Sequence, residues 1–451
     1  MKHFVKWLLV FESVFSVTTA SATDFSVLGT DISISGFGTA GFAISDKPYN
    51  YERVISDDGT FARDSLFGLQ ADIKLTDSLS VTAQGKFAPS KSRDSAWDAS
   101  LVWACLSWRP SNDLLFRFGK QRAPVYMYSE SMDVGITYDF ARLPTEMYSS
   151  SPNTDYIGAS FSKNWNLDLG ELTLDGYAGR SDAYWRHYQR DNVQVPDSSY
   201  QYGVNYFDFT MNAVGTALTL QRDDDKFRIS VHALDIKTPP NRIVKATSLV
   251  PASFFVPAAI APAFTGSAYT ILPQNLGDNL ISLAITFGAD IRLPDDFRLI
   301  GEYNHRTIVS KMESGLESDG GYLAIFKEIE EWTPYFSFAM LQSDSDLLNR
   351  YEMINNYSNV KVNPIINVPA IQNAAKLINS SQRIMADALG VFDQHTFAIG
   401  TSYRISPEQK IKLEWSKTFI GVNSALVDAP AGTTINNESI DTFSFSYNVA
   451  F

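Results

Sequence analysis

The chain has 451 residues, with 50 Asp and Glu against 37 Lys and Arg, and a formal net charge of −13. A single cysteine, Cys105, excludes an internal disulfide framework and a multi-cysteine metal site, and the acidic balance argues against nucleic-acid binding. Charged residues make up 19% and aromatic residues 13% of the chain. This combination is typical of a surface that meets lipid, although a soluble all-β protein can share it.

Residues 1–22 predict an export signal. Lys2 and Lys6 give a positive start, and residues 7–17 are mostly apolar. Small residues at 20–22 favour cleavage near Ala22. A short amphipathic helix is the alternative for this segment. No stretch of 18 or more residues is apolar and without breakers, so a helical membrane span is not expected. A chain in a membrane would therefore have to close its backbone hydrogen bonds as a barrel.

Alternation of apolar and polar side chains dominates the rest of the chain. It is clearest within residues 32–42, 67–75, 79–87, 114–118, 227–233, 281–291 and 411–415. Successive side chains on a strand point to opposite faces, so each segment has one apolar and one polar face. The pattern predicts about sixteen strands, near 30–44, 65–75, 79–87, 97–108, 114–120, 154–163, 171–180, 207–221, 226–237, 278–292, 297–307, 320–329, 332–342, 393–405, 409–420 and 440–451.

The connections between these strands are alternately short and long. Short connections rich in Asp, Asn, Ser and Pro predict tight turns, whereas longer ones include 121–153, 238–277 and 343–392. A helix is expected within the last of these, over 370–389. The predicted fold is all-β. Residues 23–451 form one domain, a transmembrane antiparallel β-barrel with short periplasmic turns and long external loops.

Two strands depart from clean alternation. Between residues 207 and 220 the apolar set changes parity, which a β-bulge near Gly215 would explain. Between Trp97 and Trp108 both faces carry apolar or aromatic residues, so the pattern leaves the direction of Cys105 open.

The last strand carries the most specific pattern. One parity is largely aromatic and ends at the chain terminus, with Phe443, Phe445, Tyr447, Val449 and Phe451. It resembles the C-terminal signature by which bacterial outer-membrane barrels are recognised by their assembly machinery. The chain as a whole resembles the sixteen-stranded Gram-negative porin family. The alternative is the terminal strand of a soluble sandwich.

The resemblance implies an outer-membrane protein in contact with lipid and lipopolysaccharide, and a homotrimer of water-filled channels. In that family the loop after the fifth strand folds into the lumen and narrows it. Here that loop is 121–153, which has a comparable length. The short Pro-Glu-Phe-Gly-type motif of general diffusion porins is absent from it.

Charges on the polar wall faces and in loop 121–153 are the candidate constriction residues. They are Arg117, Arg122, Glu130, Asp133, Asp139, Arg142, Glu146, Arg228, Arg298 and Arg404. Opposed basic wall and acidic loop residues would create a transverse field that favours polar solutes. Arg117 facing Glu130, Asp133 and Asp139 is the first candidate for the narrowest point. The alternative for each charge is a solvated residue of the lumen or rim.

No catalytic, cofactor or metal motif is apparent, and the five histidines lack metal-ligand spacing. The resemblance implies a function that is not enzymatic, namely passive diffusion of small hydrophilic solutes and ions through a water-filled channel. A substrate-specific uptake channel with a lumenal binding site and a non-channel surface barrel are the alternatives. The ion selectivity, the solute and the gating stay open.

Overall fold

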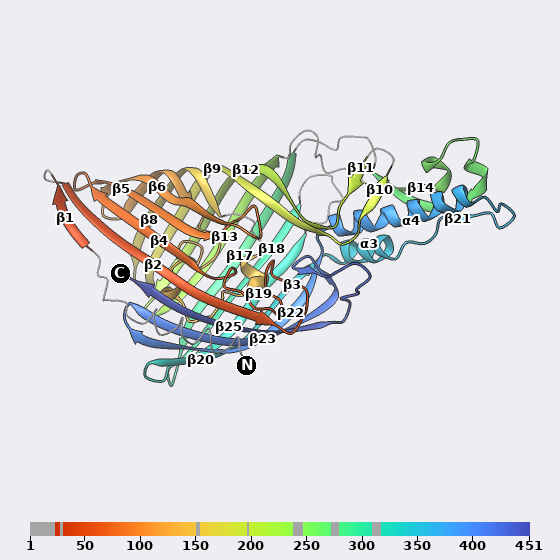
Figure 1. Cartoon of the computed structure of the whole chain (residues 1–451). Helices are drawn as coiled ribbons and strands as arrows, with labels where there is room; N and C mark the ends of the chain where they lie inside the picture. The colour runs from red at the N-terminus through yellow and green to blue at the C-terminus, as the bar shows by residue number, and fades with distance from the viewer. Residues whose placement is uncertain are drawn as a thin grey trace.

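The computed structural model describes residues 23–27, 30–149, 154–195, 198–237, 247–271, 279–308 and 317–451. Sixteen antiparallel strands form a closed barrel (Figure 1), which confirms the predicted fold. In chain order the barrel strands are β2 (Thr30–Ser45), β4 (Leu66–Lys74), β5 (Leu79–Pro89), β6 (Trp97–Ser111), β7 (Leu114–Arg122), β8 (Asp155–Leu167), β9 (Gly170–Gln189), β12 (Gly203–Arg222), β13 (Asp225–Lys237), β17 (Asn279–Leu293), β18 (Phe297–Ile308), β19 (Ser318–Lys327), β20 (Trp332–Ser343), β22 (Phe392–Ser406), β23 (Gln409–Ser424) and β25 (Ser439–Ala450). The predicted export signal, 1–22, lies outside the described residues.

The barrel closes where the last strand meets the first. β25 pairs with β2 from Ser45 to Phe37, and Gly36 and Phe451 then exchange two backbone hydrogen bonds of 2.8 and 2.9 Å. Beyond this point β1 (Thr23–Val27) pairs with β2 in place of β25. A Cβ at position 36 would lie 2.4 Å from the ring of Phe451, so glycine is what lets the ring approach the strand. The aromatic chain terminus is therefore part of the seam.

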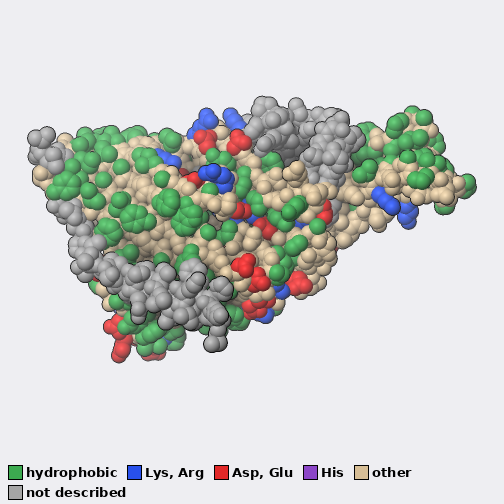
Figure 2. Space-filling view, in the orientation of Figure 1, with side chains coloured by type: hydrophobic (Ala, Val, Ile, Leu, Met, Phe, Trp, Pro, Cys, Tyr) green, Lys and Arg blue, Asp and Glu red, His purple; other side chains and the backbone are tan. Residues whose placement is uncertain are grey.

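The outer surface of the barrel is apolar, as the alternation predicts. Phe67 and Leu69 on β4 and Phe287 on β17 are each nearly half exposed, and Ile157 on β8 is 64% exposed. Hydrophobic side chains spread over the outside of the barrel on the side that Figure 2 shows. The opposite parity points inward and is mostly polar. Such a surface is suited to an apolar surrounding and a polar interior.

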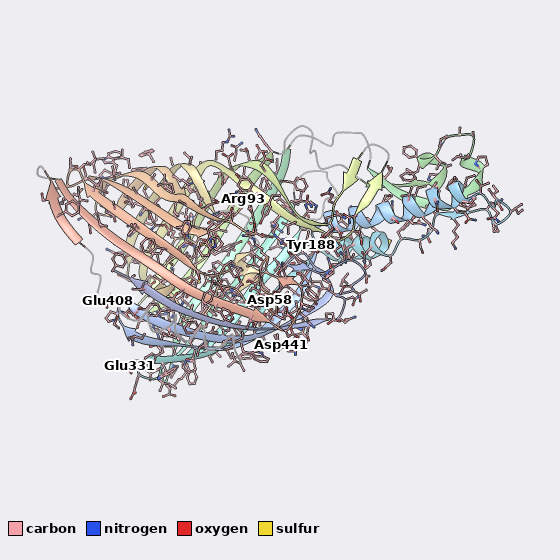
Figure 3. All side chains as sticks on the ribbon, viewed as in Figure 1. Asp58, Arg93, Tyr188, Glu331, Glu408 and Asp441 are labelled. Carbon is pink, nitrogen blue, oxygen red and sulfur yellow. The ribbon has the colours of Figure 1, made fainter. Side chains whose placement is uncertain are left out.

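The two ends of the barrel differ in their connections. At one end, the turn end, the strands are joined by short turns. The turn between β17 and β18 holds Asp295 and Asp296 at φ of 59° and 57°, which Asp tolerates better than most residues. Glu331 and Glu408 lie at this end in Figure 3. The other end, the loop end, carries all the long connections.

Small elements occupy the long loops. They are β3 (Asn50–Tyr51), η1 (Gly135–Thr137), α2 (Thr145–Tyr148), β10 (Val193–Val195), β11 (Ser198–Tyr200), β14 (Thr247–Pro251), η3 (Ala252–Phe255), η4 (Ala261–Ala263), β15 (Phe264–Thr265), β16 (Ser267–Ile271), α3 (Ser345–Asn355), β21 (Lys361–Val362), α4 (Pro369–Ala388) and β24 (Val427–Asp428). Helix α4 confirms the helix expected over 370–389. Among the described residues, none of the helices is long and apolar enough to cross a bilayer.

Residues 247–271, the described part of the loop between β13 and β17, pack on the loop between β20 and β22 beyond the barrel (Figure 1). β15 pairs with β21 through Phe264 and Val362. Ala263, Val360 and Ile378 are buried in the apolar cluster that the two loops share. Within the apolar stretch 249–264, Ala252, Ala263 and Phe264 are buried in this cluster, whereas Leu249 and Phe254 stay more than half exposed.

The irregular alternation has a different cause in each of the two strands, β12 and β6. The bulge predicted near Gly215 is wrong, because β12 stays in continuous register with both neighbours from 210 to 221. The parity changes because Phe209 and Met211 face inward, where they pack in an apolar cluster. In β6 the register does shift: Trp103 pairs with Gln84 and Leu101 with Gly85. This bulge explains the mixed faces, and Cys105 is buried on the inward parity.

Candidate pore constriction

Of the connection between β7 and β8, the described residues 123–149, here called the inner loop, lie inside the barrel. Ser230 of β13 donates a hydrogen bond to the carbonyl oxygen of Val125 at 3.1 Å. Well round the barrel, the ammonium of Lys412 on β23 donates to the carbonyl oxygen of Phe140 at 2.9 Å. Within the loop, η1 contacts β2 and β25, and α2 contacts β18, β19 and β20. The expected in-folded loop is therefore present, and it crosses the lumen.

Phe140 anchors the inner loop to one side of the wall. Its side chain is 1% exposed. Its ring centroid lies 5.5, 5.0 and 5.4 Å from those of Tyr322, Phe326 and Tyr335, with near-perpendicular planes. The next residue, Ala141, donates its backbone N–H to the Tyr335 hydroxyl at 3.0 Å. Edge-to-face packing of this kind adds to the free energy of burying the rings.

Asp133 forms the first of three charged contacts between the inner loop and its surroundings. The Lys86 ammonium of β5 lies 2.8 Å from the Asp133 carboxylate, and Arg122 also forms an ion pair with it. Arg122 in turn bridges to Asp155 at 3.2 Å. Burial alone would raise the pKa of Asp133, but the two cations lower it to about 2. Asp133 is therefore held as a carboxylate within the protein.

Asp139 forms the second charged contact, with side chains of β18, β22 and β23. Its carboxylate accepts hydrogen bonds from the Lys410 ammonium and the Ser402 hydroxyl, both at 2.8 Å. Arg298 lies 3.5 Å away and also binds Asp290 with its Nε at 2.7 Å. The charges of this group therefore compensate one another.

Arg142 forms the third charged contact, which joins the inner loop to the loop between β2 and β4, residues 46–65. Its Nε donates to Asp64 at 2.9 Å, and its Nη1 lies 3.5 Å from Glu52. Arg63 also binds Glu52, at 2.9 Å. Burial would raise the pKa of Asp64, but Arg142 lowers it below its usual value. Two loops distant in sequence are thus joined by buried ion pairs.

Glu146 lies on α2 and is 2% exposed. Its carboxylate accepts a hydrogen bond from Gln394 at 2.7 Å and another from Thr396, both on β22. Burial raises the pKa of Glu146 because these hydrogen bonds only partly offset the loss of solvation. The contact fixes the end of the inner loop against the wall.

Two wall carboxylates are likewise enclosed by tyrosines. Glu302 of β18 accepts hydrogen bonds from the hydroxyls of Tyr148 at 2.5 Å and Tyr322 at 2.9 Å. Glu414 of β23 accepts one from Tyr335 at 2.5 Å. Glu302 is 3% and Glu414 9% exposed, so neither carboxylate is displayed to a passing solute.

The predicted constriction residues separate into three groups. Arg122, Asp133, Asp139, Arg142, Glu146 and Arg298 come together through the contacts of the inner loop. Arg228 is half-buried and donates a hydrogen bond to the carbonyl oxygen of Pro124 in the inner loop at 2.6 Å, but no carboxylate of the described residues lies in ion-pair distance of it. Arg117 is half-buried and also has no such carboxylate within the described residues, and Glu130 is exposed. Arg404 is exposed near the turn end of β22, in register with Lys410 of β23.

Several contributors escaped the sequence analysis. Lys410, Asp64 and Glu52 bind the inner loop, yet nothing in their local sequence marks them. The tyrosines of the loop gave a signal that could have been used. Tyr126 and Tyr148, for example, pack at 5.2 Å edge to face, and both belong to the buried cluster around the loop or border it. Repeated tyrosines in a long connection indicate a loop that packs inward.

A cavity of about 830 Å³ opens at the turn end. Arg117 and Asp72 lie among its lining residues, together with polar side chains such as Ser33, Thr82 and Ser107. Asp72 accepts hydrogen bonds of 2.6 Å from Gln70 and Thr82. The cavity is thus a polar vestibule on the turn side of the inner loop.

At the loop end, five side chains form a second charged group, here called the rim cluster: Arg53, Asp94, Arg186, Tyr206 and Asp428. Arg186 of β9 binds Asp94 at 2.7 Å and also pairs with Asp428 on β24. Arg53 binds Asp94 at 2.9 Å, and Tyr206 of β12 donates to Asp94 at 2.5 Å. The rim cluster therefore ties loops from different sides of the barrel mouth together.

The fold and the inner loop define a closed sixteen-stranded β-barrel with an internally folded connection after the fifth barrel strand. No protein-family model matches the sequence, and no curated protein matches it. Among the described residues, no group of three His, Cys, Asp or Glu side chains is placed to hold a metal ion.

Solved structures similar to the chain are outer-membrane proteins. The anion-selective porin from Comamonas acidovorans is 9% identical over 94% of this chain and 100% of its own, with a TM-score of 0.49. The outer-membrane channel DcaP of Acinetobacter baumannii is 10% identical over 94% of this chain and 99% of its own, with a TM-score of 0.48. The trimer form of OmpT from Vibrio cholerae is 10% identical with the same coverages and a TM-score of 0.48.

Proposed function

We propose that the chain is an outer-membrane channel for passive diffusion of small hydrophilic solutes and ions. The observation that carries the proposal is a closed barrel with an apolar outer surface, a polar inner wall and a loop folded across the lumen. An apolar exterior stabilises the barrel in hydrocarbon, and a polar wall offers hydrogen bonds to water and solute. Nothing in this mechanism requires bond chemistry, so the proposed activity is transport rather than catalysis.

The proposal includes where the chain acts and what it meets. Residues 1–22 would direct export and be removed near Ala22. Phe451, which lies at the barrel seam, would be read by the barrel-assembly machinery of a Gram-negative outer membrane. The apolar outer surface would contact lipid and lipopolysaccharide, and part of it would be buried in a homotrimer. Cross-linking in detergent tests the trimer.

A substrate-specific uptake channel is the second candidate. One observation favours it: the inner loop contacts many strands of the wall and leaves a polar vestibule at the turn end that Arg117 helps to line. A narrow route past such a loop would select among solutes. Saturation of flux at low solute concentration distinguishes specific uptake from simple diffusion.

Single-channel recording in a planar bilayer tests the proposed function. Purified barrel should give discrete openings in potassium chloride, and liposomes that contain it should become permeable to small sugars. A folded barrel that never opens at any applied voltage would overturn the channel and favour a non-channel surface barrel. Heat-induced unfolding on a gel shows that the sample was folded.

A further inference from the structure

We infer that the structure is the closed state of the proposed channel, and that a turn at Glu52 and Arg53 latches the closing inner loop to the rim cluster. The inference rests on the proposed function and concerns its regulation. It combines three observations: buried residues on the inward wall, the contacts that hold the inner loop, and the turn at Glu52 and Arg53 that joins the inner loop to the mouth of the barrel.

The first observation is that buried residues occur on the inward face of every barrel strand. Examples from different sides of the barrel are Phe37, Cys105, Tyr177, His232 and Lys412, all 5% exposed or less. Residues that line a wide aqueous pore would be exposed to water. Their burial indicates that the inner loop and its neighbours fill the lumen at this level.

The second observation is that the inner loop is bound at separate points rather than loosely placed. Asp133 is bound to β5 and Asp139 to β23. Arg142 is bound not to the barrel wall but to Asp64 and Glu52 of loop 46–65. Arg142 is 10% exposed and Glu52 5% exposed at their side chains, so this contact lies in a poorly screened environment. Breaking it would leave Glu52 and Asp64 with only Arg63, whose side chain is 31% exposed, as a cation among the described residues, which is costly for buried carboxylates.

The third observation is the backbone of the turn that carries Glu52. Glu52 and Arg53 have φ values of 47° and 83°, which residues other than glycine rarely adopt. Strain of this kind persists where the surroundings enforce it, and it is frequent in functional switches. Here it sends adjacent side chains to different partners: Glu52 reaches Arg142 of the inner loop, and Arg53 reaches Asp94 of the rim cluster.

The rim cluster is itself fixed to several loops. β3 pairs with β24, and the backbone N–H of Glu52 donates to the carbonyl oxygen of Leu426 at 2.9 Å. Asp428 on β24 and Asp94 share Arg186. A displacement of Arg186 would leave Asp428 without this cation and would remove the tie between Asp94 and β24. Asp94 and Arg53 would stay paired, but they could then move together and allow the turn to relax. The contact between Glu52 and Arg142 would then be the next to loosen.

The mechanism couples the mouth of the barrel to its interior. Whatever separates Arg186 from its two carboxylates at the loop end favours the open state. In thermodynamic terms, the latch is a coupling free energy between the rim cluster and the contact of Glu52 with Arg142. Such a coupling is observed as non-additive effects of mutations at the two sites. Two groups that merely stabilise the fold independently would show additive effects instead.

The test is single-channel recording of the full mature barrel with Arg186→Gln, Arg142→Met and the double variant. The wild type should open rarely. Arg186→Gln, although it lies at the loop end, should raise the open probability at least fivefold, and Arg142→Met should do the same. The double variant should open little more than either single variant, because both changes break one latch.

The matched control is Arg93→Gln. Arg93 lies in the same loop as Asp94 but forms an exposed pair with Asp98, with side chains 67% and 40% exposed. Its replacement removes the same charge near the same mouth and should leave the open probability unchanged. If Arg93→Gln opened the channel as well, a general charge effect would explain the result and the latch would be rejected.

The outcomes separate this inference from the proposed function. A wild type that is open most of the time, with no effect of Arg186→Gln, overturns the closed state and the latch but keeps the channel. Folded wild type and variants that never conduct overturn the channel. A gel shift on heating confirms that each variant is folded, and Arg186→Lys, which keeps the charge, should restore part of the closure.

Discussion

Replacing the aromatic anchor of the inner loop should loosen the loop without unfolding the barrel. Phe140 is 1% exposed and contacts three aromatic rings at 5.0 to 5.5 Å. Removal of a buried Phe costs about 3–5 kcal/mol when the cavity does not collapse. Because the barrel strands do not depend on this ring for their hydrogen bonds, we expect the cost to fall on the docking of the loop.

Polar contacts retain part of the docking free energy in Phe140→Ala. Lys412 still donates to the carbonyl oxygen of residue 140 at 2.9 Å, and the N–H of Ala141 still donates to Tyr335 at 3.0 Å. Each contributes about 1–2 kcal/mol, but neither replaces the lost packing. A net loss of about 3 kcal/mol raises the ratio of undocked to docked loop by roughly a hundredfold.

The assay is single-channel recording, with flux of larger sugars into liposomes as a second measurement. Phe140→Ala should open more often and admit larger solutes than the wild type. The control is Phe336→Ala on the outward face of β20, where the side chain is 45% exposed and touches no part of the inner loop that the structure describes. Equal opening, equal solute size limit and equal heat stability in wild type and Phe140→Ala would refute the anchoring role.

Three further changes test other parts of the structure. Arg117→Glu should shift the reversal potential in a salt gradient toward cation selectivity by several millivolts or more. The reason is that Arg117 borders the vestibule and has no carboxylate partner among the described residues. An unchanged reversal potential would show that Arg117 lies outside the ion route. The pKa of Asp133 is lowered to about 2. Its ion pairs should therefore stabilise the docked inner loop fully above about pH 4 and be lost as the pH falls through about 2. Intrinsic fluorescence during acid titration should show the loop released only near that pH. Gly36→Val should reduce the yield of folded barrel severalfold, since a Cβ there meets the ring of Phe451 at 2.4 Å. The control Gly85→Ala, whose Cβ meets only the carbonyl oxygen of Ser100 at 3.8 Å, should fold with nearly normal yield. Equal yields for both would show that the seam tolerates a side chain.

The sequence alone determined the architecture because the signals for it are local. The alternation of side chains that predicts a strand is visible within a few residues, and a tight turn is predicted from two to four residues such as Asp295 and Asp296. Sixteen such segments, their short turns and the helix within 343–392 were therefore all predicted, and the structure confirms them. The terminal aromatic strand was also apparent, since its parity and its end at Phe451 need no knowledge of partners.

The tertiary structure decided which charges meet. Asp139 binds Lys410, 271 residues away, and Arg142 binds Asp64, 78 residues away. Neither pair leaves a local pattern, because an inward polar residue looks the same in sequence whether it faces water or a buried partner. The parity change in β12 shows the same limit: the register does not shift, and Phe209 and Met211 are apolar residues on the inward face that pack against side chains of β9 and β13. The alternation along the chain predicts a barrel, but whether its lumen is open or filled depends on contacts between residues far apart in sequence.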